Sequence, residues 1–285
     1  MSVFFAILRK SVYLFFALTF LIGGLLSTPS TVEGPGLTLE REIDYFYSDG
    51  AAFCQGITTD GRSFYGTGCI KPLFYNAIVR IDMESGDVLE SRDLCLPYEM
   101  IRLGYSHLGD GAYFDGKLYI ACETNTFKDP AVMVYDAESL DFLAYHVLPP
   151  EGQGNGHFPW LCIRDGVIYY TQAREVSEVR MLSLTDFSFL GSIPMDREIT
   201  KIAGGDLLGD TLYLSADSDG GKKITYAVNL ATGETKDAFV RDTGNEATEA
   251  EGLVIYSENG RTYFCYVDVL WLCNASIRIY SFEQE

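Results

Sequence analysis

Residues able to bind a ligand or to move a proton recur along this chain at intervals of about 50 positions. Each stands a few residues before a polar turn, and aligning those turns brings together Gln55, Asp110, Trp160, Gly204 and Glu251. Two carboxylates and an amide around one axis can act as an acid–base system, because close carboxylates raise each other's pKa. The pattern therefore predicts Asp110 and Glu251 as catalytic residues and Gln55 and Trp160 as ligand contacts.

Three further side chains fall beside this set. Asp206 lies two residues after Gly204, and His107 and His157 occupy equivalent positions three residues before two of the aligned residues. We expect Asp206, His107 and His157 to line the same site and to contact the ligand.

The expected site contains neither a metal ion nor another cofactor. One alternative stays open, in which Asp110, Asp206 and Glu251 hold calcium, since carboxylate oxygens are ligands that this hard cation prefers. Another alternative is that these polar side chains only contact water and one another along the axis.

The elements that must position these residues are short strands in a repeated order. Asp115-Gly116 and Asn259-Gly260 are typical of the turns between them, because Asp, Asn and Gly tolerate the positive φ angles of tight hairpins. A strand-like segment with an aromatic residue follows the turn in each repeat, at residues 63–68, 117–122, 167–172, 211–216 and 262–267. Repeats of about 50 residues with four strands are typical of β-propeller blades.

Five such repeats need about 250 residues, which residues 31–285 supply. We therefore predict an all-β fold, a five-bladed β-propeller. The last repeat lacks an outer strand, and residues 37–46 are a lone strand before the first repeat, so we expect this N-terminal strand to close the last blade. Glu251, Gln55 and Asp110 then converge, because their blades are neighbours. The inner strands are expected near residues 52–59, 107–114, 157–164, 202–208 and 249–256.

The first 30 residues differ from the rest. Arg9 and Lys10 are their only charged residues, and an apolar run extends from Val12 to Leu26. The run is long for a signal-peptide core and short for a bilayer span of about 20 residues. Residues 1–30 are thus predicted to be a cleaved signal peptide or a retained N-terminal anchor, with residues 11–26 as the membrane tether. Both interpretations place the propeller outside the cytoplasm, secreted or membrane-anchored.

Charge and cysteine content bear on partners and compartment. The chain has 40 Asp and Glu against 21 Lys and Arg, a net charge of -19, which repels a phosphate backbone and argues against a nucleic-acid partner. Its 7 cysteines suggest disulfides plus one unpaired thiol if the chain is exported. Cys265–Cys273 and Cys69–Cys95 are the expected bridges. The open alternative is that the cysteines are small buried apolar residues.

The inner segments of the first two repeats resemble a known enzyme family. Residues 52–57 read Ala-Phe-Cys-Gln-Gly-Ile and are followed by Tyr65, by Thr67-Gly68 and by an Asp-x-x-x-Gly turn at residues 82–86. This order is similar to the first blade of the plant and bacterial type of glutaminyl cyclotransferase, a five-bladed propeller. Residues 108–111, Leu-Gly-Asp-Gly, resemble the family's Phe-Gly-Glu-Gly with Asp in place of Glu.

Matches to the same family continue through the later repeats. Trp160-Leu161 falls near its Trp-Gly-Leu, and Asp206 falls on the last acid of its Asn-Glu-Leu-Glu. Trp271 matches the tryptophan of a Lys-x-Trp motif in the last blade, which adds Trp271 to the expected ligand contacts. Ala203 and Val269 stand where the family has Asn and Lys.

The resemblance implies a reaction in which the α-amine of an N-terminal glutamine attacks its own side-chain amide, releasing ammonia and leaving pyroglutamate. It implies that Gln55 orients the substrate, that Asp110 is the acid–base group and that Trp160 forms a pocket wall. Asp110 is one methylene shorter than the family's Glu, and a displacement of about 1 Å can lower a rate about a hundredfold.

We therefore expect an extracytoplasmic propeller that binds a small polar ligand or a peptide N-terminus at its central channel. Three alternatives remain open. The first is an active glutaminyl-peptide cyclotransferase, which we prefer among enzymes. The second is a calcium-dependent hydrolase of the lactonase or esterase type. The third is a propeller that binds other proteins through its acidic outer faces.

Overall fold

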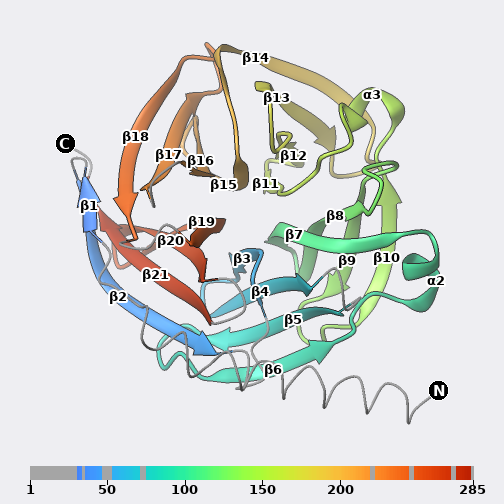
Figure 1. The fold of residues 1–285 in the computed structure, drawn as a ribbon, viewed down its shortest axis with the longest axis horizontal. Helices are drawn as coiled ribbons and strands as arrows, with labels where there is room; N and C mark the ends of the chain where they lie inside the picture. Colours follow the sequence, from blue (N-terminus) through green and yellow to red (C-terminus); the bar gives the residue numbers. More distant parts are fainter. Residues whose placement is uncertain are drawn as a thin grey trace.

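The protein forms a ring of five antiparallel sheets around one axis (Figure 1), which confirms the predicted all-β, five-bladed propeller. A computed structural model describes residues 31–33, 36–46, 53–70, 75–218, 222–243, 247–270 and 274–283. In each blade four strands, or three in blade 5, follow one another in sequence from the axis outward, and an N-terminal strand is added at the outer edge of blades 4 and 5.

The five sheets are built from the following strands. Blade 1 contains β3 (Gly56–Thr59), β4 (Ser63–Ile70), β5 (Tyr75–Asp82) and β6 (Val88–Asp93). Blade 2 contains β7 (Tyr105–Phe114), β8 (Lys117–Thr124), β9 (Ala131–Asp136) and β10 (Phe142–Val147). Blade 3 contains β11 (Cys162–Arg164), β12 (Val167–Tyr170), β13 (Val176–Ser183) and β14 (Phe189–Ile199). Blade 4 contains β15 (Ile202–Leu208), β16 (Thr211–Asp217), β17 (Lys222–Asn229) and β18 (Thr235–Asp242), with β1 (Thr31–Glu33) as an added outer strand. Blade 5 contains β19 (Thr248–Glu258), β20 (Arg261–Leu270), β21 (Asn274–Phe282) and β2 (Leu37–Phe46).

In the described part of the chain, two short helices lie between blades. Helix α2 (Tyr98–Arg102) precedes blade 2, and α3 (Pro150–Gln153) precedes blade 3.

The turns between the two innermost strands follow the local chemistry of their residues. Asp115-Gly116, Asp165-Gly166 and Asn259-Gly260 have positive φ at both positions. These angles match the right-handed twist of a two-residue hairpin. The predicted hairpin turns are therefore confirmed at these three places.

The N-terminal strand closes the ring, as predicted. Strand β2 pairs antiparallel with β21, with Ile43 opposite Ile277. The guanidinium of Arg41 on β2 donates to the carbonyls of Met83 (3.0 Å), Glu84 (2.7 Å) and Ser85 (3.0 Å) in the turn between β5 and β6. Strand β2 thus completes blade 5 and also holds it against blade 1.

The core consists of apolar clusters that lie between neighbouring blades. Phe53 and Val267 belong to the cluster between blades 5 and 1, while Trp160 and Leu214 belong to the one between blades 3 and 4. Because both faces of each sheet are covered, inner and middle strands such as β4 and β9 are buried along almost their whole length.

Neither predicted disulfide forms. Cys95 and Cys265 are free, buried thiols in different inter-blade cores, so the expected pairings with Cys69 and Cys273 are wrong, and Cys273 itself lies outside the described residues. Burial raises the pKa of the Cys95 thiol to about 12. These cysteines act as small apolar core residues.

None of the helices in the described part of the chain is long and apolar enough to cross a membrane. The predicted signal peptide or anchor, residues 1–30, lies outside that part.

Candidate functional site

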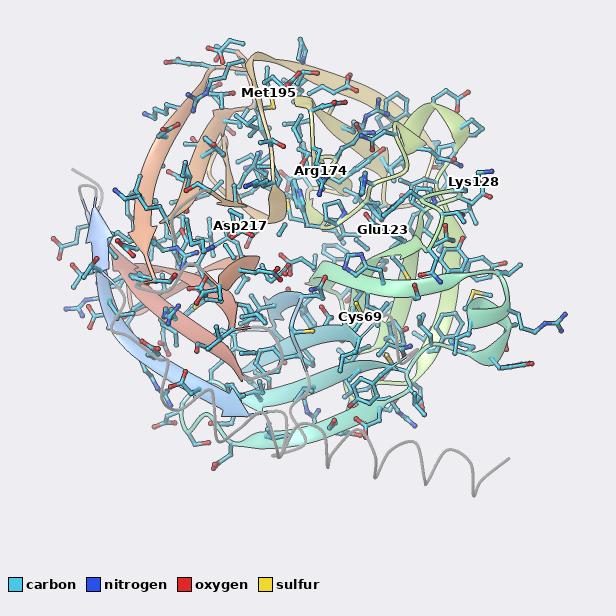
Figure 2. The ribbon with its side chains drawn as sticks, in the orientation of Figure 1. Cys69, Glu123, Lys128, Arg174, Met195 and Asp217 are labelled. Carbon is cyan, nitrogen blue, oxygen red and sulfur yellow. The ribbon has the colours of Figure 1, made fainter. Side chains whose placement is uncertain are left out.

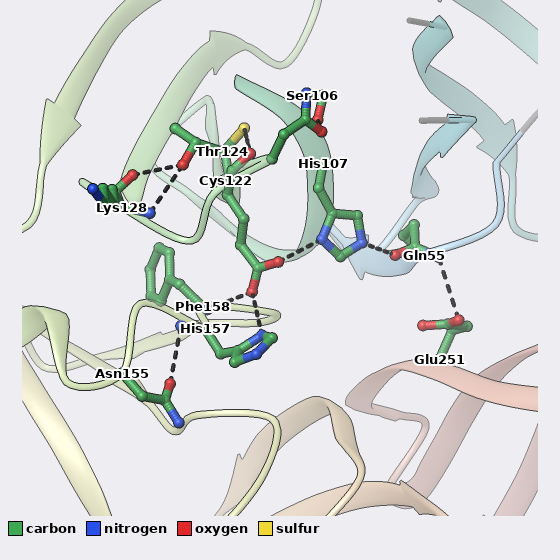
Figure 3. A network of polar contacts seen from close by, with 12 residues as sticks. Gln55, Ser106, His107, Cys122, Thr124, Lys128, Asn155, His157, Phe158 and Glu251 are labelled. Atoms are coloured by element: carbon green, nitrogen blue, oxygen red, sulfur yellow. Dashed lines mark hydrogen bonds and ion pairs between the residues drawn. The ribbon is translucent and has the colours of Figure 1, made fainter. Parts of the chain in front are cut away.

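Five polar side chains gather where the inner strands begin, and we call them the axial cluster. Gln55 precedes β3, His107 lies on β7, Glu123 lies near the end of β8, His157 precedes β11 and Glu251 lies on β19. Four neighbouring blades therefore contribute to the cluster, which Figure 3 shows as one connected set of polar contacts.

Glycines let these inner strands approach one another closely. A Cβ atom on Gly56 would lie 2.4 Å from Cα of Asp110 in blade 2, and one on Gly252 would lie 2.6 Å from the backbone nitrogen of Ile57 in blade 1. Both distances are too short for a side chain. Because no Cβ is present, the side chains beside these glycines can meet across the axis.

Gln55 joins two members of the cluster. Its Nε2 donates to Oε1 of Glu251 at 3.3 Å and to the backbone carbonyl of Cys54 at 2.6 Å. Its Oε1 is hydrogen-bonded to Nε2 of His107. The structure thus brings together three residues that the sequence pattern had proposed for the site.

Glu123 holds the two histidines and was not identified from the sequence. Its Oε2 lies 2.8 Å from Nδ1 of His107, and its Oε1 accepts the Phe158 N–H at 2.6 Å and lies 3.6 Å from Nδ1 of His157. Burial raises the pKa of Glu123, but the hydrogen bond and charge of His107, together with the other donors, outweigh burial and leave that pKa below its usual value. Glu123 is therefore an ionised carboxylate that orients both imidazoles.

Glu251 has the opposite electrostatic setting. Burial, followed by the negative charges of Glu249, Asp217 and Asp110, raises the pKa of Glu251 well above its ordinary value, against a smaller lowering by the Gln55 hydrogen bond. A carboxyl in such a setting keeps its proton to higher pH than an exposed glutamate does. Glu251 can therefore give up a proton when a positive charge approaches.

Lys223, a cation on strand β17 of the neighbouring blade, is already paired. Nζ of Lys223, whose side chain is 3% exposed, donates to Oδ1 of Asp217 at 2.6 Å. The same oxygen accepts the Ala250 N–H at 2.8 Å. In Figure 2, Asp217 and Glu123 lie on opposite sides of the centre of the ring. Lys223 thus balances Asp217 and leaves Glu249 and Glu251 as an excess of acid.

Asp110, the acid–base residue suggested by the family resemblance, accepts hydrogen bonds from the backbone of three blades. We call a side chain with this role a backbone tie. It is 1% exposed, and its Oδ1 accepts the N–H groups of Ile57 (2.7 Å) and Gly111 (3.0 Å). Its Oδ2 accepts the N–H of Leu253 at 3.1 Å. Asp110 therefore connects blades 1, 2 and 5, and both of its oxygens are occupied.

Asp206 plays a similar part between blades 4 and 5. Its Oδ1 accepts the Leu207 N–H at 2.8 Å, and its Oδ2 accepts the Ile255 N–H at 2.7 Å. Burial raises the pKa of Asp206 to about 6, against the lowering effect of these two N–H groups.

This pKa predicts a pH-dependent stability. The folded protein holds the Asp206 proton more tightly than the unfolded chain does, so the free energy of unfolding should fall as pH rises from about 4 to about 6. The rise of the pKa from 3.8 to about 6 corresponds to about 3 kcal/mol. Asp206→Asn should show a correspondingly flatter dependence in urea unfolding measured from pH 4 to 7.

Asp210→Asn is the matched control, because it removes the same charge from a side chain that is 89% exposed. It should follow the wild-type pH dependence. Parallel curves for wild type and Asp206→Asn would contradict the prediction.

The two tryptophans are not part of the axial cluster. Trp160 is fully buried in the core between blades 3 and 4, and its Nε1 donates to Oγ1 of Thr171 at 3.0 Å. With its N–H satisfied and no exposed surface, its ring packs in the core and forms no wall of the axial site. Trp271 lies outside the described residues.

Within the described ranges, no three His, Cys, Asp or Glu side chains are grouped so that they could hold a metal ion. Asp110 and Asp206 direct their oxygens at backbone N–H groups.

No protein-family model matches the chain, and no curated protein matches it. Solved structures do match: Myxococcus xanthus glutaminyl cyclase aligns with a TM-score of 0.60 and 14% identity, covering 87% of this chain and 97% of that chain. The two proteins share a fold. A β-xylosidase aligns with a TM-score of 0.58 and 13% identity, covering 85% of this chain and 96% of that one. An enzyme from Xanthomonas citri complexed with xylose aligns with a TM-score of 0.53 and 14% identity, covering 82% of this chain and 89% of that chain.

At these identities the likeness concerns the fold alone. The resemblance to glutaminyl cyclotransferases seen in the sequence is thus confirmed at the level of the five-bladed architecture.

Proposed function

We propose that the axial cluster binds the positively charged amino end of a peptide or of another small amine, and that Glu251 is the group that contacts it. One observation carries the proposal. Asp110 and Asp206 have both oxygens occupied by backbone N–H groups, whereas Glu251 accepts a single side-chain hydrogen bond, from Gln55. Among the three aligned acids, Glu251 therefore has an oxygen available for a ligand.

The charges around Glu251 favour a cation. Glu249 and Asp217 raise its pKa, and the nearby ammonium of Lys223 is paired with Asp217. An ammonium group hydrogen-bonded to Glu251 would relieve this repulsion and form a charge-assisted hydrogen bond. The shared fold with a glutaminyl cyclase supports a peptide that begins with glutamine as the first ligand to test.

Glu251→Gln should weaken binding of a Gln-initiated peptide by about 10- to 100-fold, because a hydrogen bond to a charged group contributes about 1.5–3 kcal/mol. Isothermal titration calorimetry measures this change. Glu258→Gln, at the other end of β19, is the control and should bind as the wild type does. The N-acetylated peptide, which lacks the charge, should bind the wild type as weakly as the free peptide binds Glu251→Gln.

Binding should also release a proton. The raised pKa of Glu251 means that the free protein holds a proton there, and an ammonium group stabilises the ionised form, so the proton leaves on binding. Affinity should therefore increase with pH until Glu251 is ionised. Titrations in buffers with different ionisation enthalpies detect the released proton. Equal affinity for the free and the acetylated peptide would overturn the proposal.

A second candidate, cyclotransferase catalysis, is favoured by the same raised pKa, since a carboxyl that keeps its proton to higher pH than usual can act as a general acid. In this candidate Glu251 takes the acid–base role that the family resemblance had assigned to Asp110. Ammonia released from the Gln-initiated peptide by wild type and lost in Glu251→Gln would support it. Release no faster than in buffer alone would leave binding as the function.

A further inference from the structure

The hydrogen bonds of Gln55 have a defined direction. Its Nε2 donates to two acceptors, the Cys54 carbonyl and the Glu251 carboxyl, so its Oε1 is the atom that faces His107. A carbonyl oxygen only accepts, and Nε2 of His107 must therefore carry a hydrogen.

The second ring nitrogen of His107 also faces an acceptor. Nδ1 lies 2.8 Å from Oε2 of Glu123, whose depressed pKa leaves it ionised and without a hydrogen to give. An imidazole with donors at both nitrogens is the cationic imidazolium. His107 lies between Glu123 and the pair Gln55–Glu251 (Figure 3), and with this orientation of Gln55 only the cationic ring satisfies both contacts.

Loss of that proton requires a second arrangement. Glu123 retains the hydrogen on Nδ1, so Nε2 of His107 becomes an acceptor, and Gln55 must turn its amide over to donate to it. The turned amide presents Oε1 to Glu251. Two acceptor oxygens repel each other unless Glu251 carries a proton, in which case its O–H donates to Gln55.

We propose that Gln55 couples His107 to Glu251, so that the two residues share one proton. In the first arrangement His107 is a cation and Glu251 a carboxylate, and in the second both are neutral. One proton leaves Nε2 of His107 for solvent and one enters at Oε1 of Glu251 from solvent, so the pair holds the same number throughout. The Cys54 carbonyl loses its donor in the second arrangement, whereas burial and the acids beside Glu251 favour that arrangement because it places the proton on Glu251.

The remaining charges around the pair form a background that both arrangements share. They are Glu123 on β8, His157 before β11, Asp110 on β7, Glu249 on β19, Asp217 on β16 and Lys223 on β17. The three acids beside Glu251 disfavour a further negative charge on Glu251 and so help it to take up the proton.

The inference concerns the same cluster as the proposed function but needs no ligand. Its test is a titration of the free protein, so failure here would leave the binding proposal standing, and failure of the binding experiment would leave the coupling standing.

NMR titration from pH 4.5 to 9 tests the coupling. The chain has 3 histidines, and His146, which stacks on Phe187 in a neighbouring blade, is an internal reference outside the cluster. The His107 ring nitrogens and the Glu251 carboxyl carbon should each titrate in two steps, with the steps of both residues at the same pH values. Glu251→Gln and Gln55→Leu should each reduce the His107 curve to a single step.

Asp210→Asn, which removes an exposed acid, should keep the two-step curve. Because two variants probe the coupling from its two sides, one that fails to fold leaves the other to decide. A single-step His107 curve in wild type, unchanged in either variant, would overturn the inference. So would a Glu251 step at a pH where His107 does not change.

Discussion

Asp268→Asn is expected to lower the free energy of unfolding by about 3–5 kcal/mol, because it removes the negative charge that pairs with two buried guanidinium groups. Oδ2 of Asp268 accepts from Nη1 of Arg241 at 2.5 Å and from Nη1 of Arg278 at 2.7 Å, and the two arginine side chains are 1% and 7% exposed. Burial raises the pKa of Asp268, but the two arginines outweigh burial and leave that pKa below its usual value. The residue is therefore ionised at neutral pH.

The position of this cluster enlarges the effect. Arg241 lies on β18 of blade 4, with its guanidinium 3.7 Å from the ring centre of Tyr266, and Arg278 continues to Glu42 on the closing strand β2 at 3.1 Å. One carboxylate thus links blade 4, blade 5 and the strand that closes the ring. Loss of its charge should weaken the closure along with the ion pairs.

Urea unfolding of Asp268→Asn and of Asp237→Asn distinguishes this role from a general effect of charge. Asp237 forms an ion pair with Arg197 at the surface and is 52% exposed, so its removal should change the free energy of unfolding by no more than about 1 kcal/mol. A triple variant with Met, Leu and Met at positions 241, 268 and 278 should recover most of the loss, since apolar side chains of similar volume often replace buried ion pairs without loss. Equal stability of the two single variants would contradict the prediction.

The five-bladed ring was predictable because it follows from two simple features of the sequence, the residues of the hairpin turns and the number of strands in each repeat. Asp-Gly and Asn-Gly pairs such as Asp115-Gly116 and Asn259-Gly260 tolerate the positive φ of tight hairpins better than other residues do, so their spacing marks the hairpins without any tertiary information. The lone strand at residues 37–46 had one open edge to fill, and the fifth blade lacked one strand. Neither inference depends on how side chains pack.

The candidate site was harder to predict from the sequence. Aligning the blades shows which residues lie at equivalent positions, but it does not show which groups each side chain contacts. Gln55 and Glu251 meet as the alignment of the blades predicts. Asp110 has the same register, yet neighbouring backbone reaches it through Gly56, and only the three-dimensional spacing of the inner strands shows that amides occupy its oxygens. The residue type alone cannot separate a tie from an acid–base group.

Glu123 was missed because the alignment compared inner strands, and Glu123 lies near the end of the second strand of its blade. One signal existed in the sequence. Glu123 follows the apolar run of residues 118–122, where a charged residue needs a buried partner. His107, its partner, stands opposite it across the β7–β8 hairpin, so pairing strands as well as aligning them could have found the contact.

The cysteines show why an expected export of the chain is not enough to predict disulfides. An exported chain with 7 cysteines suggests disulfides, but each blade of a propeller packs its own face against the next, and Cys95 and Cys265 lie in cores on different sides of blade 1. Sγ of Cys95 is hydrogen-bonded to Asn76 at 3.4 Å. Spacing in the sequence carried no information about which core each thiol enters.

Asp110→Ala is expected to lower the free energy of unfolding by about 3–5 kcal/mol, and Asp110→Asn by about 1–3 kcal/mol. Alanine leaves the N–H groups of Ile57, Gly111 and Leu253 without their acceptor in the interior, where an unsatisfied donor is unfavourable by about 1–3 kcal/mol. Asparagine retains one oxygen, so two of the bonds can persist, while its amide nitrogen faces the third N–H. The order of the two variants follows from this difference.

The same pair of variants separates a tie from a catalyst. If Asp110 ties the blades together, Asp110→Asn studied well below its melting temperature should bind a Gln-initiated peptide within about twofold of wild type, since no ligand contact has been removed. Asp115→Asn, in the exposed turn of the same blade, is the control and should change stability by no more than about 0.5 kcal/mol. The opposite result, wild-type stability in Asp110→Asn together with lost ligand binding or lost ammonia release, would place Asp110 against the ligand and return to it the acid–base role that the second candidate function assigns to Glu251.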